Sequence, residues 1–78
     1  MTITVRYWAA AMAAAGVEAE EYPAGRLSSV LAAAQSVHPE LERVLAVASV
    51  LVEGVPAQPD VEVPAGATVE ILPPFAGG

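Results

Sequence analysis

The chain ends in Pro73-Pro74-Phe75-Ala76-Gly77-Gly78, and this ending carries the clearest chemical signal in the sequence. Because the last two residues are glycines, the carboxylate of Gly78 has no side chain beside it and can enter a narrow channel. Small, frayed chain ends are common, but this ending directly follows an alternating, strand-like segment. We therefore expect an extended tail over residues 73–78 that presents its terminal carboxylate as a reactive group.

The composition of the tail suits insertion into another protein. Fully extended, it would reach roughly 20 Å, while the domain itself stays on the partner's surface. Pro73 and Pro74 lack N–H donors and restrict the backbone, so they can end a sheet and stiffen the base of the tail. Phe75 is either an anchor for a pocket on the partner or a side chain that folds back onto its own domain.

The segment from Val69 to Gly78 resembles the C-terminal signature of the small sulfur-carrier proteins. Within them it is most similar to the small subunit of molybdopterin synthase, and the thiazole-synthesis sulfur carrier is the near relative. The resemblance extends over the whole chain in the order of its elements, but it is specific only in this last segment.

The resemblance implies a particular chemistry for the chain end. An ATP-dependent adenylyltransferase of the ubiquitin-activating type would adenylate the carboxylate of Gly78. A sulfur donor protein would convert it to a thiocarboxylate, and the large subunit of molybdopterin synthase would use that sulfur on a pterin precursor for the molybdenum cofactor. The tail and partner-binding residues implied are Gly77, Ala76, Phe75, Pro74 and Pro73.

Nothing in the sequence could carry out these steps. It has no phosphate-binding glycine-rich loop, no lysine and no cluster of metal ligands. We therefore expect a substrate and carrier, which is not an enzyme by itself and has no intrinsic cofactor or metal. ATP would be used by the activating enzyme.

Composition sets further limits. Because there is no cysteine, disulfides and thiolate sites are excluded and any sulfur must come from outside. No apolar run of about 18 residues exists that could span a membrane. Residues 1–5 lack the features of a signal peptide, so the cytoplasm is the expected location.

The net charge of −6 comes from nine acidic residues against Arg6, Arg26 and Arg43. This balance argues against a nucleic-acid partner, whose phosphates need cations. It suits docking onto a basic protein surface, and it equally suits simple solubility. The lack of lysine also means that the chain cannot be joined to another through its own lysine side chains.

Apolar periodicity predicts a strand over residues 2–8, with Ile3, Val5 and Tyr7 on one face, and a last strand over residues 68–72. Alanines predict a helix over residues 9–15 that Gly16 ends. The other expected elements are an edge strand at 17–22, a helix that begins at Leu27 or after a serine cap and ends near Val37, a short helix at 40–45, a strand at 48–53, and extended pieces at 55–56 and 61–64.

This order predicts an α+β fold with helices packed on one face of a mixed sheet. We expect a domain over residues 1–72 followed by the tail at 73–78. The resemblance implies a ubiquitin-like β-grasp, in which the first and last strands pair in parallel at the sheet centre. The residues expected to be mostly buried are Ile3, Val5, Val30, Leu31, Val50, Val52, Val69 and Ile71.

Some conspicuous side chains have plain explanations. Trp8, on the face opposite Ile3, either packs under a helix, which we favour, or is exposed in an interface. His38 precedes a proline and is expected in a loop or helix cap. Glu18, Glu20 and Glu21 are expected to form a solvated edge.

Two alternative functions stay open. The chain could carry sulfur for another pathway, to thiazole, cysteine or another sulfur metabolite. It could instead be a ubiquitin-like binding or modifier domain, whose terminus forms amide bonds or none.

Overall fold

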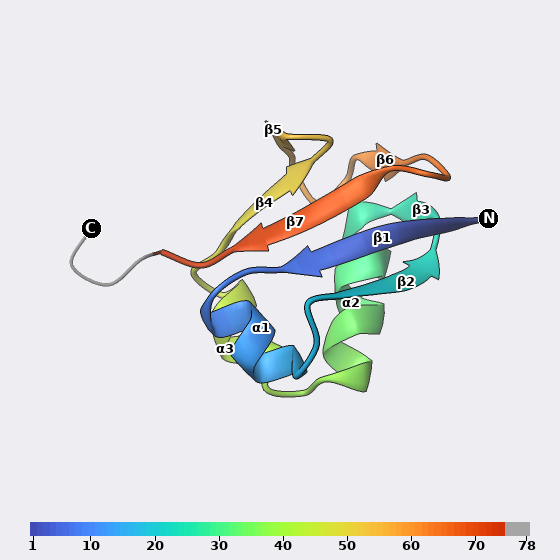
Figure 1. Ribbon diagram of the computed structural model, residues 1–78. Helices are drawn as coiled ribbons and strands as arrows, with labels where there is room; N and C mark the ends of the chain where they lie inside the picture. Colours follow the sequence, from blue (N-terminus) through green and yellow to red (C-terminus); the bar gives the residue numbers. More distant parts are fainter. Residues whose placement is uncertain (75–78) are drawn as a thin grey trace.

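A five-stranded mixed sheet is the framework of the computed structural model, which describes residues 1–74 (Figure 1). The strands are β1 (Thr2–Tyr7), β2 (Ala19–Pro23), β3 (Gly25–Arg26), β4 (Ser49–Val52), β5 (Val55–Pro56), β6 (Glu62–Val63) and β7 (Thr68–Leu72). The helices are α1 (Ala10–Ala15), α2 (Leu27–Val37) and α3 (Leu41–Leu45). Strands β3 and β6 form a separate antiparallel pair, which the sequence analysis did not anticipate.

The strand order in the main sheet is β2-β1-β7-β4-β5. The central strand β7 pairs in parallel with β1, from Thr4 opposite Thr68 to Tyr7 opposite Ile71, and antiparallel with β4. All three helices lie on one side of the sheet (Figure 1). The expected parallel pairing of the first and last strands and the β-grasp architecture are therefore confirmed.

Alternation of apolar and polar residues fixes which face of the central strands meets the helices. Ile3, Val5 and Tyr7 of β1 are buried, as are Val69 and Ile71 of β7. A shift of the register by one residue would turn these side chains to solvent. The opposite side of the sheet, which we call the open face, has no helix over it among the described residues.

The ends of the helices follow local chemistry. Helix α1 ends where Gly16 adopts a left-handed conformation with φ of 79° and its N–H donates to Met12, as expected for a glycine stop. Helix α2 begins at Leu27, without a side-chain cap, and ends at Val37, because Pro39 disfavours helical geometry in the residue before it.

The predicted core is confirmed, since each residue expected to be mostly buried either lies in the core or packs against it. Leu31, Val50 and Val52 are only half-buried, although they pack against the core. Leu31 lies on the flank of α2, whose buried residues are Leu27, Val30 and Ala34. Val50 and Val52 lie on β4, whereas the helices contact chiefly β1, β2 and β3. The fully buried Leu41 of α3 takes up core space that the sequence analysis did not assign.

Candidate functional site

The base of the tail leaves the domain directly from the central strand. Leu72 is half-buried, Pro73 is buried and Pro74 is exposed, so the chain reaches the surface between the two prolines. This end of β7 lies opposite the end of the sheet where the N-terminus lies (Figure 1). The predictions for Phe75, Ala76, Gly77 and Gly78 lie outside the described residues.

Strand β1 ends beside the base of the tail because β1 and β7 run in parallel. Tyr7 is in register with Ile71, and the N–H of Trp8 donates to the carbonyl of Ile71 at 3.2 Å. Because side chains alternate along a strand, Tyr7 and Trp8 point to opposite faces of the sheet. Tyr7 lies opposite Ile71, which is two residues before Pro73.

Trp8 lies on the open face and is 39% exposed. Its indole N–H donates to Glu70 Oε2 at 3.1 Å, and the guanidinium carbon of Arg6 lies 5.4 Å from the ring centroid. The favoured expectation that Trp8 packs under a helix is thus wrong, because alternation along β1 puts it on the same face as Arg6. A held, half-exposed aromatic ring is a typical interface side chain.

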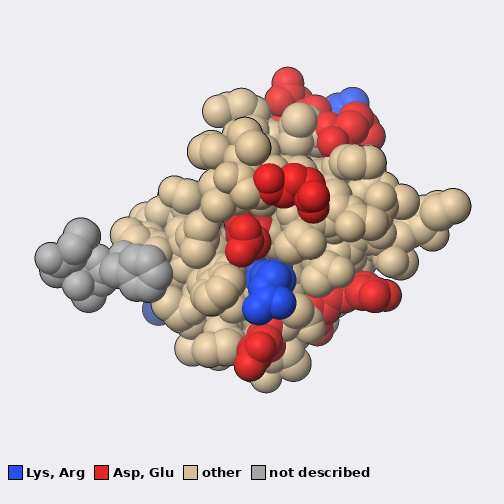
Figure 2. Space-filling model, turned by 45° about the horizontal axis from the view of Figure 1, so that its top comes forward, with Lys and Arg blue, Asp and Glu red and all other residues tan. Residues whose placement is uncertain are grey.

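The rest of the open face is mixed in character. Leu51 and Leu72 are half-buried there, and Arg6 and Glu70 face each other across the β1–β7 register. Among the charged side chains on the face seen in Figure 2, acidic ones are the more widespread, and the basic patch at its centre lies between acidic ones. Arg26, on β3, forms an ion pair with Glu62 of β6, with 3.7 Å between Arg26 Nε and Glu62 Oε2.

On the helix side of the sheet, Glu20 organises a polar cluster with Tyr7, Tyr22 and His38. The oxygen Oε1 of Glu20 accepts the hydroxyl protons of Tyr7 at 2.9 Å and Tyr22 at 2.8 Å. His38 Nε2 lies 2.7 Å from the same oxygen. The two tyrosine hydroxyls are 3.3 Å apart, and the His38 ring meets Tyr7 edge-on at 6.0 Å between centroids.

This cluster shifts the ionisation of its members. Burial alone would raise the pKa of the Glu20 carboxyl, but hydrogen bonds from Tyr22, His38 and Tyr7 outweigh it and lower that pKa. Burial raises the pKa of both tyrosine hydroxyls. Glu20 therefore stays ionised and the tyrosines stay neutral at neutral pH.

This cluster changes one sequence expectation and confirms another. Glu20 is half-buried rather than part of a solvated edge, whereas Glu18 and Glu21 are exposed as expected. His38 follows the end of α2 and its N–H donates to the carbonyl of Ala34, which confirms a cap position. Alternation within each strand was a partial signal only, because the β1–β2 register is what places Tyr7 and Glu20 on the same side of the sheet.

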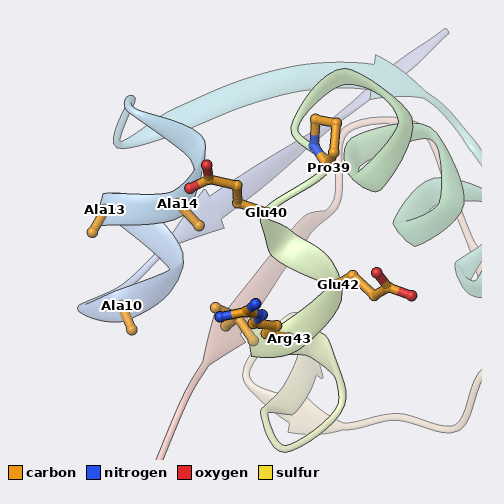
Figure 3. Close-up of a pocket in the computed structure, with 8 residues that line it drawn as sticks. Ala10, Ala13, Ala14, Pro39, Glu40, Glu42 and Arg43 are labelled. Atoms are coloured by element: carbon orange, nitrogen blue, oxygen red, sulfur yellow. The ribbon is translucent and has the colours of Figure 1, made fainter.

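A groove of about 570 Å³ lies between α1 and α3 (Figure 3). The side chains of Ala10, Ala13 and Ala14 line its α1 side, and Arg43 points into it from α3. Its lining residues include no histidine, serine or cysteine that could act as a nucleophile or base. Within residues 1–74 no group of three His, Cys, Asp or Glu residues is placed to hold a metal ion.

None of the helices in the described part of the chain is long and apolar enough to cross a membrane. Every buried side-chain nitrogen or oxygen in residues 1–74 has a hydrogen-bond partner. The described residues thus form a domain in which the buried polar side chains are hydrogen-bonded. The chain leaves this domain at the end of β7, which we call the exit point.

The fold and this exit point together define a ubiquitin-like β-grasp domain whose central strand leads into its C-terminal residues. The ThiS family profile matches residues 5–78. The chain therefore belongs to the ThiS family, the small sulfur-carrier family that its ending resembles. A comparison with curated proteins gave no significant match.

Solved structures share the fold. SAMP1 from Haloferax volcanii matches with a TM-score of 0.90 and 24% identity over 100% of both chains. A putative molybdopterin converting factor, subunit 1, from Pyrococcus furiosus matches with a TM-score of 0.83 and 24% identity, over 96% of this chain and 99% of that one. A complex of subunits 1 and 2 of molybdopterin-converting factor from Helicobacter pylori matches with a TM-score of 0.77 and 22% identity over 100% of both chains.

Proposed function

We propose that this protein is the small, sulfur-carrying subunit of a molybdopterin synthase, with Gly78 as the residue that bears the sulfur. The observation that supports this most is the ending Pro73–Gly78, which continues the central strand of a ThiS-family β-grasp domain. Among the neighbours in fold is a complex of subunits 1 and 2 of molybdopterin-converting factor.

In the proposed activation, the Gly78 carboxylate attacks the α-phosphorus of ATP on an adenylyltransferase, and pyrophosphate leaves. A sulfur donor protein then supplies sulfur at the sulfide level to the acyl carbon, and AMP leaves. The product is a C-terminal thiocarboxylate. ATP belongs to the activating enzyme in this scheme, and the carrier contributes only its carbonyl group.

In the proposed delivery step, the tail enters the large subunit, and the thiocarboxylate sulfur attacks an electrophilic carbon of a pterin precursor, from which the oxygen substituent leaves as the C–S bond forms. Water then attacks the resulting thioester and restores the Gly78 carboxylate. Glycines at 77 and 78 would allow close approach in a narrow channel, and a preordered proline-rich base would lower the entropy cost of insertion.

The proposed docking surface is the end of the open face next to the tail. Trp8 and Leu72 offer apolar area there, and Glu70 and Arg6 hold the Trp8 ring in place. The surrounding acidic surface suits a partner with a basic rim, because complementary potentials speed encounter and fix orientation. We expect the adenylyltransferase and the large subunit to use this surface in turn.

The test is reconstitution with defined partners. The carrier is incubated with ATP, the adenylyltransferase and a sulfur donor, then supplied to the molybdopterin synthase large subunit with the pterin precursor. Formation of the pterin dithiolene supports the proposal. Thiocarboxylate that is consumed only by a thiazole- or cysteine-forming enzyme would place the carrier in another pathway. Amide conjugates on other proteins, without sulfur transfer, would make it a modifier.

A further inference from the structure

The cluster around Glu20 lies on the helix side of the sheet, at the end where β1 finishes and where β7, the next strand, leads into the tail. Three donors from three elements converge on a single carboxylate oxygen: Tyr7 from β1, Tyr22 from β2 and His38 from the turn after α2. Hydrogen bonds to a charged acceptor are roughly twice as strong as neutral ones. The cluster therefore ties the end of β1 to the edge strand and to the end of α2.

Tyr7 connects this cluster to the base of the tail by short steps. It is the last residue of β1, 2% exposed, and in register with Ile71. The next residue, Trp8, donates its N–H to the Ile71 carbonyl and its indole N–H to Glu70. The end of β1 is thus held on the helix side of the sheet through Tyr7 and on the open face through Trp8. Both contacts lie close to the point where β7 leads into Pro73.

We propose that Glu20 is a positioning residue for tail delivery: it fixes the end of β1, and through Tyr7 and Trp8 it holds the docking surface and the tail base in one orientation. This inference rests on the proposed function for its effect on sulfur transfer, but not for its effect on structure. The lowered pKa of the Glu20 carboxyl supports the charged state that the cluster needs at neutral pH.

The proposal distinguishes Glu20 from its neighbour on the same strand. Glu21 is exposed and faces Thr4 on the open face. Glu20→Gln and Glu21→Gln remove the same charge from adjacent positions, so Glu21→Gln is a matched control. Tyr22→Phe removes only one donor from the cluster and serves as the milder variant if Glu20→Gln does not fold.

The structural readouts use the single tryptophan of the chain. Acrylamide quenching of Trp8 fluorescence reports how firmly the ring is held. Hydrogen exchange at two backbone amides reports local opening: Tyr7 N–H donates to the Glu18 carbonyl, and Trp8 N–H donates to the Ile71 carbonyl. Exchange at the backbone amide of Thr4, which donates to the Ala67 carbonyl, reports global unfolding. All are measured on the full chain at pH 7.

In Glu20→Gln we expect Trp8 to become easier to quench and exchange at Tyr7 and Trp8 to become about tenfold faster, because hydrogen bonds to a charged group are lost. Exchange at Thr4 should change less, and Tyr22→Phe should give a smaller effect in the same direction. Glu21→Gln should match the wild type. Equal acceleration at Thr4, Tyr7 and Trp8 would mean that Glu20 only stabilises the whole fold, and would overturn the proposal.

The functional readout is the activation reaction with ATP and the adenylyltransferase. We expect Glu20→Gln to raise the apparent KM for the carrier with little change in kcat, because a loose docking surface loses binding that is common to ground and transition states. A looser Trp8 with an unchanged KM would overturn the positioning role. If wild-type protein is not activated at all, the proposed function fails, whereas the quenching and exchange results still test the coupling.

Discussion

At the residue scale, the ionised carboxyl of Glu20 gives a testable pH dependence. Its pKa in the folded protein lies below the ordinary value of 4.5, so its stabilising contribution is present above that value and is lost as the pH falls through the folded pKa. We expect Glu20→Gln to lower the free energy of unfolding by about 1–3 kcal/mol at pH 7. Urea titrations should show this difference shrinking as the pH falls below 4.5 and through the folded pKa.

If Glu20→Gln lowered the free energy of unfolding by the same amount at every pH, the pKa argument would be contradicted. Such a result would mean that Glu20 stabilises the fold through packing rather than through its charge. Glu21→Gln provides the control, since Glu21 is exposed. The two neutral tyrosines and His38 face the Glu20 oxygen and are unchanged in both variants.

Also at the residue scale, Phe75 stays a prediction, because it lies outside the described residues. If its ring fills a pocket on the large subunit, Phe75→Ala should weaken binding by about 2 kcal/mol or more, as measured by titration calorimetry. The unfolding midpoint should stay the same. A mutant that binds normally but unfolds more easily would instead show that Phe75 packs on its own domain.

At the scale of elements, α3 and α2 should respond differently to the same truncation. Leu41 of α3 is fully buried, whereas Leu31 of α2 is half-buried. Leu41→Ala should therefore cost about 2–5 kcal/mol of unfolding free energy, and Leu31→Ala should cost less than Leu41→Ala. Chemical denaturation of both mutants checks this, and a larger loss for Leu31 would contradict the assigned core.

The turn from β1 into α1 carries backbone strain at Ala9, whose φ is 51° and ψ is −121°. Only glycine adopts such positive φ values without cost. Ala9→Gly should raise the free energy of unfolding by up to about 1 kcal/mol. Ala13→Gly, within α1 and exposed, should lower it by about 1 kcal/mol, and thermal melts that show both changes with the same sign would argue against the strain.

The elements show what the sequence could predict and what it could not. The last strand was predicted with its observed bounds because Val69 and Ile71 alternate with polar residues. Trp8 was misplaced because we favoured burial for a large aromatic ring, although alternation already put it opposite Tyr7. The β3–β6 pair was missed because the two-residue strand Gly25–Arg26 has too little periodicity to detect, although Glu62–Val63 lies within the extended piece expected at 61–64.

Part of the candidate site could be predicted from the sequence, and part could not. The ending Pro73–Gly78 was visible as a motif, because the proposed chemistry follows from the types and order of its residues. The Glu20 cluster was not visible, because its members come from β1, β2 and the turn after α2. Contacts between distant segments follow from topology and packing, which local patterns do not encode.

At the scale of the whole molecule, the helices on one side of the sheet leave the open face and the end of β7 available to a partner (Figure 1). The sheet's outer strand β2 is short, carries Glu20 and Glu21 and ends in Pro23. These features discourage pairing with another strand. We therefore expect partners to approach the open face beside the tail rather than the edge of the sheet.

The central claim is that the chain end itself carries sulfur. Intact-mass spectrometry of wild-type protein and of a variant that lacks Gly78, each incubated with ATP, adenylyltransferase and sulfur donor, tests it most directly. Removing the last residue retracts the carbonyl by about 3.3 Å, and a displacement of about 1 Å can cost 100-fold in rate. We predict that the wild type gains the mass of one oxygen-to-sulfur exchange, located by fragmentation at Gly78, and that the shortened protein stays folded and unmodified. Equal sulfur loading of both proteins would contradict the account.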